Sequence, residues 1–260
     1  MTTTIELPSW AQPDTDLSGK TVLVIGGAGG VGEGITRALL DAGAAVIATA
    51  RTQAKLDDLA ERIDDANLTT LRLDLTGPDL DDTLAALVDR HGRHGRLDGV
   101  VVSVADWGRQ GPKGILDLTD AEWEALVEQN QTTVFRAYRA LVPALAPEGA
   151  IVHINGFSAE IPYPANGVMA LTAAATKSMV RTIAEELKGA GLRVYEVILG
   201  VIRTRPRQLA GIDNPRWIPA VEVGMHTAEL VAGNSPLAES ALQYFVTREA
   251  GPSLTPPEMP

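Results

Sequence analysis

A run of glycines near the start of the chain could bind a phosphate group. It directly follows the β-branched, apolar run Thr21–Ile25 and precedes Val31–Asp41, whose apolar residues have helical spacing. Both a G-x-G-x-x-G and a G-x-x-x-G-x-G pattern are present, formed by Gly26, Gly27, Gly29, Gly30 and Gly32. Glycine permits positive φ and lets the backbone approach a ligand, and the N-terminus of the following helix presents free N–H groups. A strand, a glycine turn and a helix in this order predict the pyrophosphate site of a dinucleotide.

The end of the next predicted strand, Ala45–Ala50, indicates which dinucleotide binds. An Asp or Glu here would bind the ribose 2′-hydroxyl of NAD, but the sequence continues with Arg51 and Thr52. The planar guanidinium of Arg51 can hold a 2′-phosphate through charge-assisted hydrogen bonds. We therefore expect NADP(H) as the cofactor; the alternative is that Arg51 is a solvated surface residue.

Strand-like and helix-like segments alternate along the rest of the chain. Apolar runs predict strands at 69–73, 97–104, 150–155, 192–199 and 241–247, and helical spacing predicts helices at 52–63, 80–88, 120–144, 166–188 and 221–231. This alternation predicts one α/β domain over 19–250. We expect a doubly wound Rossmann-type parallel sheet of about seven strands, in the order 3-2-1-4-5-6-7, with helices on both faces. An N-terminal arm (1–18), a small substrate lid (about 203–225) and a C-terminal tail (251–260) complete the expected organisation.

Composition excludes several classes of function. The 260 residues carry a formal net charge of −11 and contain no cysteine. So acidic a surface repels nucleic acid and anionic membranes, and without thiols there is no disulfide, thiolate metal site or cysteine nucleophile. We expect no metal. Neither a signal-peptide pattern nor an apolar run long enough to span a membrane is present, so the expected location is the cytoplasm.

These motifs together resemble the short-chain dehydrogenase/reductase family over about residues 19–250. Leu73-Asp74-Leu75 is similar to the family's stretch after the third strand, whose Asp contacts adenine. Asn130 matches its active-site Asn, and Gly200–Thr204 resembles its turn around the nicotinamide carboxamide. The resemblance implies an NAD(P)-dependent oxidoreductase. The residues expected to line the cofactor site are Gly26, Gly29, Gly30, Val31, Gly32, Arg51, Thr52, Asp74, Leu75, Ser103, Ile202 and Thr204.

The catalytic triad of that family is absent from this sequence. In the family a Tyr donates the proton, a Lys four residues later lowers the Tyr pKa, and a Ser thirteen residues earlier polarises the carbonyl. Aligning Arg181–Leu187 with the family's helix end places Gly156, Met169 and Ala173 at the Ser, Tyr and Lys positions. No tyrosine in the chain is followed by a lysine four residues later, so no register restores the dyad.

Other polar residues could fall near the strand ends and replace the missing acid. Ser158 and Tyr163 are candidates by position, although both residue types are also typical of loops and surfaces. Asn130 is a further candidate, with bonding of backbone near a helix distortion as its alternative role. The remaining polar residues of this kind are Ser103, Asp106, His153 and His226. Met169, which can adapt to an aromatic face, and Trp217 in the lid are expected to contact substrate; for Trp217 the alternative is simple loop packing.

The sequence leaves more than one function open. A reductase can work without its own acid, because the cofactor supplies the hydride and a ketone beside a phenol carries an internal hydrogen bond. Aromatic-polyketide ketoreductases of the family with a degraded dyad resemble this chain, which implies an NADPH-dependent ketoreductase for a small hydrophobic substrate in antibiotic biosynthesis. The alternatives are a dinucleotide-binding sensor or partner subunit without chemistry, and a non-redox enzyme on the same fold.

The two long helices, 120–144 and 166–188, form the dimer face in that family, which implies a homodimer or homotetramer.

Overall fold

The computed structural model describes residues 7–105, 110–111 and 113–256. Within these residues a parallel sheet of seven strands runs in the order β3-β2-β1-β4-β5-β6-β9, which confirms the predicted order, with β9 in the seventh place. The strands are β1 (Thr21–Ile25), β2 (Ala45–Ala50), β3 (Leu68–Arg72), β4 (Leu97–Val102), β5 (Leu145–Gly156), β6 (Arg193–Leu199) and β9 (Leu242–Phe245). The order reverses between β1 and β4, and ligands of such sheets bind at the carboxyl ends of the strands beside this point.

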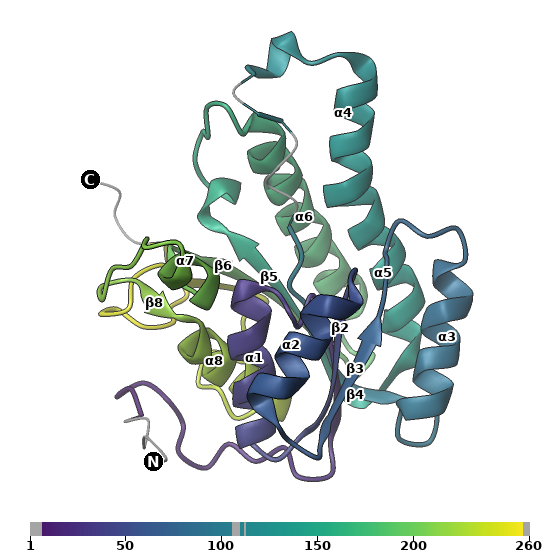
Figure 1. Cartoon of the computed structure of the whole chain (residues 1–260). Coiled ribbons are helices and arrows are strands. Elements are labelled where there is room, and N and C mark those ends of the chain that lie inside the picture. Colours follow the sequence, from purple (N-terminus) through teal and green to yellow (C-terminus); the bar gives the residue numbers. More distant parts are fainter. Residues whose placement is uncertain (1–6, 106–109, 112, 257–260) are drawn as a thin grey trace.

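Helices cover both faces of the sheet (Figure 1). One face carries α1 (Gly30–Asp41), α2 (Gln53–Ile63) and α8 (Ala220–Ala232), and the other carries α3 (Leu80–His91), α5 (Thr133–Leu141) and α6 (Gly167–Glu186). Leu39 of α1 and Val223 of α8 are buried in the first apolar layer. Leu84, Tyr138 and Val180 are buried in the second. The doubly wound prediction is therefore confirmed.

The predicted helix 120–144 is not continuous. It consists of α4 (Asp120–Val127), a π-helical turn at 128–132, α5 and a 3₁₀ turn at 142–144. Thr119 caps its start, and its hydroxyl accepts a hydrogen bond from the Glu122 backbone N–H. Inside the wide turn, polar side chains bond carbonyls one turn earlier: Asn130 Nδ2 donates to the Leu126 carbonyl (3.1 Å) and Thr133 Oγ1 to that of Gln129 (2.8 Å). Such bonds compete with regular helix bonding, which is why an α-helical pattern alone did not predict the interruption.

The segment after β6 forms a small unit of its own. It contains β7 (Ile202–Arg203), α7 (Arg205–Leu209) and β8 (Ile218–Pro219), with β7 and β8 paired in parallel. The expected lid at about 203–225 therefore includes these elements and the start of α8, which begins at Ala220. α8 packs closely on α1, since a Cβ on Gly224 would lie 2.5 Å from the Gly34 carbonyl oxygen.

The described parts of both chain ends pack on the domain. Leu17 is fully buried, and the Trp10 ring meets Phe245 edge-on at 5.3 Å between centroids. Ser253 pairs with Tyr244 through two 2.8 Å backbone hydrogen bonds. The expected arm and tail are thus ordered against β9 over this range. No helix among the described residues has the length and apolarity that crossing a bilayer would require.

Candidate functional site

The glycine turn forms a cradle between β1 and α1. Gly26 has φ +82°, and a Cβ there would lie 2.2 Å from the Ser103 carbonyl oxygen. A Cβ on Gly32 would lie 2.0 Å from the Gly26 carbonyl oxygen. The turn therefore requires glycine at both places, and α1, twelve residues long, starts directly after it at Gly30. Its free N–H groups and positive dipole end suit a pyrophosphate.

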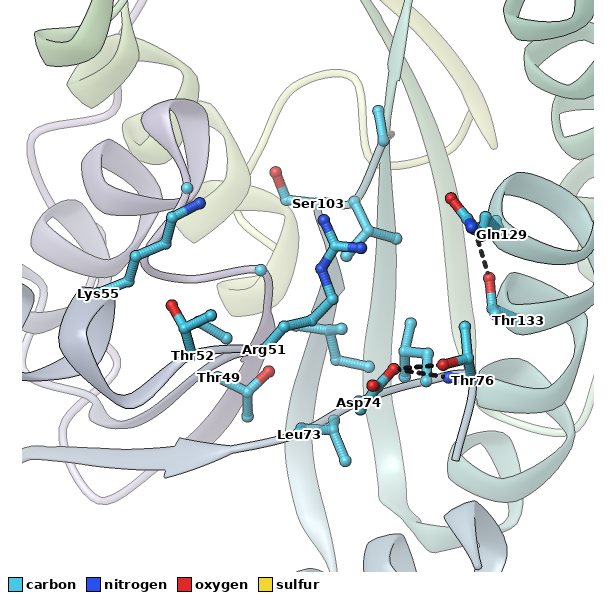
Figure 2. Close-up of a pocket in the computed structure, with 17 residues that line it drawn as sticks. Thr49, Arg51, Thr52, Lys55, Leu73, Asp74, Thr76, Ser103, Gln129 and Thr133 are labelled. Atoms are coloured by element: carbon cyan, nitrogen blue, oxygen red, sulfur yellow. Dashed lines mark hydrogen bonds between the residues drawn. The ribbon is translucent and has the colours of Figure 1, made fainter. Parts of the chain in front are cut away.

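A cleft of about 380 Å³ continues from this turn across the ends of β2 and β3. Figure 2 shows Arg51 extending across the cleft toward Ser103, with the side chain of Lys55 reaching the same cleft from α2. The predicted cofactor residues on its wall are Gly26, Gly29, Arg51, Thr52, Asp74, Leu75 and Ser103. Two cations therefore stand where the second strand ends, the place expected to meet the adenosine ribose.

Asp74 contributes the single carboxylate among the described residues that line this cleft. Its Oδ1 accepts hydrogen bonds from the Thr76 hydroxyl (2.7 Å) and the Thr76 backbone N–H (3.0 Å), both drawn in Figure 2. These bonds, with a smaller contribution from Arg51, lower the pKa of the Asp74 carboxyl. The carboxylate is held toward Thr76 on the β3 side, and no acid stands at the end of β2 itself.

A second cavity, of about 330 Å³, lies on the other side of the glycine turn. It shares Gly29, Ser103, Val104 and Ala105 with the first, so the two form one path along the carboxyl edge of the sheet. Its predicted cofactor residues are Gly29, Gly30, Val31, Gly32, Ser103, Ile202 and Thr204. The structure thus brings all twelve predicted cofactor residues onto one continuous cleft. Its glycine cradle, its helix N-terminus and the two cationic side chains, Arg51 and Lys55, fit a dinucleotide.

The three positions that the sequence alignment places at the family's triad meet at a third, small cavity of about 40 Å³. Gly156, Met169 and Ala173 all line it, and the Met169 and Ala173 side chains are buried at 5% and 8% exposure. It adjoins the second cavity through Val104 and Gly156. The wall that these three positions form therefore presents a thioether and a methyl group to the cavity.

Three of the candidate donors line this cavity: Ser158, Asn130 and His153. Ser158 is buried, lines the cavity, and its Oγ has no hydrogen-bond partner among the described residues. Asn130 also lines it, but its amide is engaged by the π-turn, the backbone role that the sequence offers as the alternative. Tyr163 is 41% exposed and is not among the residues lining the three cavities.

Of the two candidate histidines, one lines the site and the other does not. His153 lines the small cavity, and burial lowers its pKa to about 3, so its ring is neutral. His226 lies on α8, on the other face of the sheet, where Nε2 is 2.7 Å from Gln243 Oε1. His226 does not line any of the three cavities. Asp106 lies outside the described residues.

The lid segment is braced by arginines. Arg203 forms two hydrogen bonds with the Asp213 carboxylate, at 2.6 and 2.7 Å. Arg207 donates to the Ile202 carbonyl (2.6 Å), lies over the Trp217 ring at 5.5 Å from its centroid, and lines the second cavity. Trp217 thus packs inside the lid, and its contact with substrate stays a prediction.

Sequence reasoning missed several residues of the site. Lys55, Thr76, Gln129 and Arg207 line the cleft although no sequence motif marks them. Lys55 could have been found from the sequence, because it follows Arg51 by four residues and lies in the first turn of the helix after β2. No group of three or more metal-ligating side chains that could hold an ion occurs among the described residues.

Comparison with known proteins fits this geometry. Residues 20–213 match the model of the short chain dehydrogenase family. The chain is 32% identical over 196 residues to a short chain dehydrogenase/reductase, dpchG, of Colletotrichum higginsianum, covering 72% of this chain and 71% of that protein. It is 27% identical over 205 residues to a fluoren-9-ol dehydrogenase of Terrabacter, covering 72% of this chain and 57% of that protein.

A similar solved structure is an NADPH-bound short chain oxidoreductase of Pseudomonas aeruginosa described as containing an atypical catalytic center. Its TM-score is 0.71 at 24% identity, covering 87% of this chain and 94% of that one, which shows the fold. The matched family model spans most of the chain, including the glycine turn, the three triad positions and the start of the lid. The chain therefore belongs to the short-chain dehydrogenase/reductase family and is an NAD(P)-dependent oxidoreductase.

Proposed function

We propose that the protein is an NADPH-dependent ketoreductase that reduces a carbonyl of a flat, hydrophobic substrate of the aromatic-polyketide type. It would act without a tyrosine proton donor, in the manner of a polyketide tailoring enzyme such as the simocyclinone C7 ketoreductase. The observation that carries this proposal is the apolar wall of Gly156, Met169 and Ala173 beside a complete dinucleotide cleft.

The two cations of the adenosine cleft support NADPH over NADH. Arg51 and Lys55 both line the part of the cleft at the end of β2, where an acid would select the ribose 2′-hydroxyl. A 2′-phosphate brings negative charge that these side chains can meet with charge-assisted hydrogen bonds. The NADPH-bound Pseudomonas aeruginosa oxidoreductase offers a parallel on the same fold.

The apolar wall favours a polycyclic aromatic substrate. Met169 is unbranched and polarisable, and such a side chain adapts its shape to an aromatic face. The small Ala173 and Gly156 leave room that a tyrosine–lysine dyad would occupy. The similar Terrabacter protein is named for a fused-ring alcohol, fluoren-9-ol, which fits this class of ligand.

The chemistry can be divided between cofactor, substrate and protein. A bound reduced nicotinamide supplies the hydride to the carbonyl carbon. The protein's residues position the ketone, which is worth several kcal/mol of the barrier. A phenol beside the ketone holds the carbonyl oxygen in an internal hydrogen bond, stabilises the negative charge that develops there and gives the first proton.

A matched pair of ketones tests this function. Oxidation of NADPH is followed by its absorbance, with a polycyclic phenolic ketone and with the methyl ether of the same compound. We expect turnover of the phenol and a loss of roughly 10²-fold or more for the ether, the contribution of a positioned acid. Equal turnover of both would contradict substrate assistance. Tight NADPH binding without any turnover would favour a sensor or partner subunit.

We also infer a homodimer or homotetramer built on the outer faces of α4, α5 and α6. Large apolar side chains are exposed there: Phe135 on α5 is 48% exposed and Leu171 on α6 is 42% exposed. Light scattering at micromolar concentration tests this inference. A monomer would contradict it, and Phe135→Arg should shift an oligomer toward smaller species.

A further inference from the structure

Polar side chains gather beneath the apolar triad positions. His153 and Asn155 project from β5 toward the α5–α6 layer, and Glu196 projects to the same face from β6, directly opposite His153 in the strand register. Glu196 is fully buried. A buried carboxyl on an inner strand of a sheet is costly unless it is hydrogen-bonded or neutral, so its presence here requires a physical reason.

Asn155 links this carboxyl to the active-site positions. Its Nδ2 donates to Glu196 Oε1 at 2.7 Å and to the Ala173 carbonyl at 2.9 Å, while its Oδ1 accepts from the Gly156 N–H at 2.8 Å. The amide therefore uses both of its donors and an acceptor to connect Glu196 with the places of the missing Lys and Ser. Glu196 is one amide away from the wall that faces the substrate.

Unpaired polar atoms surround the small cavity. Ser158 Oγ and His153 Nδ1, from residues lining it, and Glu196 Oε2 just beneath are buried without a hydrogen-bond partner among the described residues. The cavity, about 40 Å³, exceeds the roughly 10–15 Å³ that one water requires. A polar space of this size with unpaired groups at its edge is the kind of place that holds ordered water.

Of the titratable groups around the cavity, Glu196 is suited to exchange a proton near neutral pH. Burial raises the pKa of Glu196 to about 8, against smaller lowering effects from the Asn155 hydrogen bond and Lys177; Glu160 raises it. His153 stays neutral because burial lowers its pKa to about 3, and burial raises the pKa of Tyr138 far above neutrality.

The charged groups on the far side of Glu196 are already paired. Lys177 Nζ lies 2.9 Å from Glu160 Oε1, and the Tyr244 hydroxyl donates to the same oxygen at 3.2 Å. Burial and Glu160 raise the pKa of Tyr244. Lys177 therefore holds Glu160 rather than forming an ion pair with Glu196, which leaves the Glu196 carboxyl free to be the neutral acid.

We propose that Glu196 is a proton store for this site and supplies, through water in the cavity between His153, Asn155 and Ser158, the proton that carbonyl reduction consumes. The inference rests on the proposed reductase function and deepens it. When hydride reaches the carbonyl carbon, the carbonyl electron pair moves to oxygen, which takes the phenol proton. Cavity water reprotonates the phenolate, Glu196 reprotonates that water, and the Glu196 carboxylate then regains a proton from solvent.

A pH profile tests the store. In wild-type protein we expect kcat for ketone reduction to be high below about pH 8 and to fall above it, because the acid form of Glu196 is the active one. Glu196→Gln can still accept the Asn155 hydrogen bond but holds no exchangeable acid. We expect a loss of roughly 10²-fold in kcat at neutral pH and a flat profile. Glu196→Asp should restore part of both the rate and the pH dependence.

Glu229→Gln is the matched control. Glu229 is also buried, at 2% exposure, but lies on α8 on the opposite face, where it accepts the Gln12 N–H at 2.8 Å. Its substitution should leave the profile unchanged. A Glu196→Gln protein that keeps the wild-type rate and profile would overturn the proposal, and so would the same profile change in both variants.

Infrared spectroscopy of the cofactor-free protein gives a readout that does not depend on turnover. A carboxylic-acid band that is present at neutral pH, disappears above about pH 8 and is missing in Glu196→Gln is expected. The band should shift in deuterium oxide within the mixing time, because the cavity water connects Glu196 with solvent. Absence of the band, or a band that does not exchange, would overturn the proposal that Glu196 stores the proton. An exchanging band in a protein that reduces no ketone would contradict the reductase function alone.

Discussion

The adenosine end of the cleft and its catalytic end lie on the same edge of one sheet, but their side chains differ in kind. The adenosine end keeps the glycine turn, the Asp74–Thr76 pair and two cations, Arg51 and Lys55. The catalytic end has Met169 and Ala173 at its wall and keeps its polar groups one layer below, around Asn155. One end binds through exposed groups, and the other presents an apolar surface.

The difference follows from what each end must do. Holding a dinucleotide requires backbone N–H groups and charges at fixed places, which no substrate can supply. Hydride transfer is the chemistry of the cofactor, so the catalytic end needs to supply only position and a proton. A substrate with its own hydroxyl, together with a buried acid, can provide that proton without a tyrosine at the wall.

The largest expected effect concerns the glycine turn. Gly26→Ala places a Cβ 2.2 Å from the Ser103 carbonyl oxygen at φ +82°, so we expect loss of both NADPH and NADH binding and a lower unfolding free energy, by roughly 1–3 kcal/mol from backbone strain alone. Gly189→Ala is the control, because Gly189 has φ +88° with no atom within 4 Å of the added Cβ. Equal effects in titration calorimetry would show that strain, not the cradle, decides binding.

The second effect is on stability and concerns the buried acid. Glu196 has a pKa of about 8 in the fold against 4.5 when exposed, so the folded state binds more protons between these values and its stability falls as pH rises through them. His153 acts oppositely: its pKa of about 3 against 6.5 makes stability fall as pH drops below 6.5.

Glu196→Gln separates these two contributions. Between about pH 6.5 and 8 only Glu196 contributes of the two, so the wild-type denaturant midpoint should fall there by the equivalent of a few kcal/mol, and that of the variant should not. If the denaturant midpoints of wild type and variant changed with pH in the same way across this range, Glu196 would already be ionised in the folded protein.

The third effect concerns the two cationic side chains at the adenosine end. Arg51→Ala should weaken NADPH binding by roughly 10- to 10²-fold, the worth of hydrogen bonds between charged groups, and leave NADH binding nearly unchanged. Lys55→Ala should show the same selectivity with a smaller loss, because an ammonium meets a phosphate as a point charge without the planar fork of Arg51. Equal losses for both cofactors would remove these cations from the 2′-phosphate role.

The smallest expected effect is at the catalytic wall. Replacing Met169 by Tyr together with Ala173 by Lys rebuilds the family dyad in its own register, yet we expect no gain in turnover of the native substrate. The new side chains fill the apolar wall, and in the proposed mechanism the substrate's phenol, not a protein acid at the wall, gives the first proton. A large gain in kcat would contradict both substrate assistance and the supply of protons from below.

Much of the cofactor end could be predicted from contiguous residues. A glycine turn between a strand and a helix, Arg51 directly after β2 and the repeated strand–helix alternation are local patterns, and their meaning depends on neighbours in the chain. The missing dyad is equally local, since a tyrosine and a lysine four residues apart can be looked for at every position. The fold, the glycine turn and Arg51 follow from such patterns, while Asp74, Leu75, Ile202 and Thr204 were expected only from the family resemblance.

By itself, then, the sequence determined the sheet, the dinucleotide cradle and the absence of the family's Tyr-x-x-x-Lys pattern. Only the tertiary structure decided what stands in its place. Asn155 and Glu196 are 41 residues apart and meet because β5 and β6 pair in register, and burial between the sheet and its helices raises the pKa of Glu196 to about 8. His226, which sequence position placed near the site, belongs to the opposite layer for the same reason. Burial and pairing across strands are properties of the assembled layers. They set the pKa of Glu196, which in the sequence is simply one glutamate in an apolar strand.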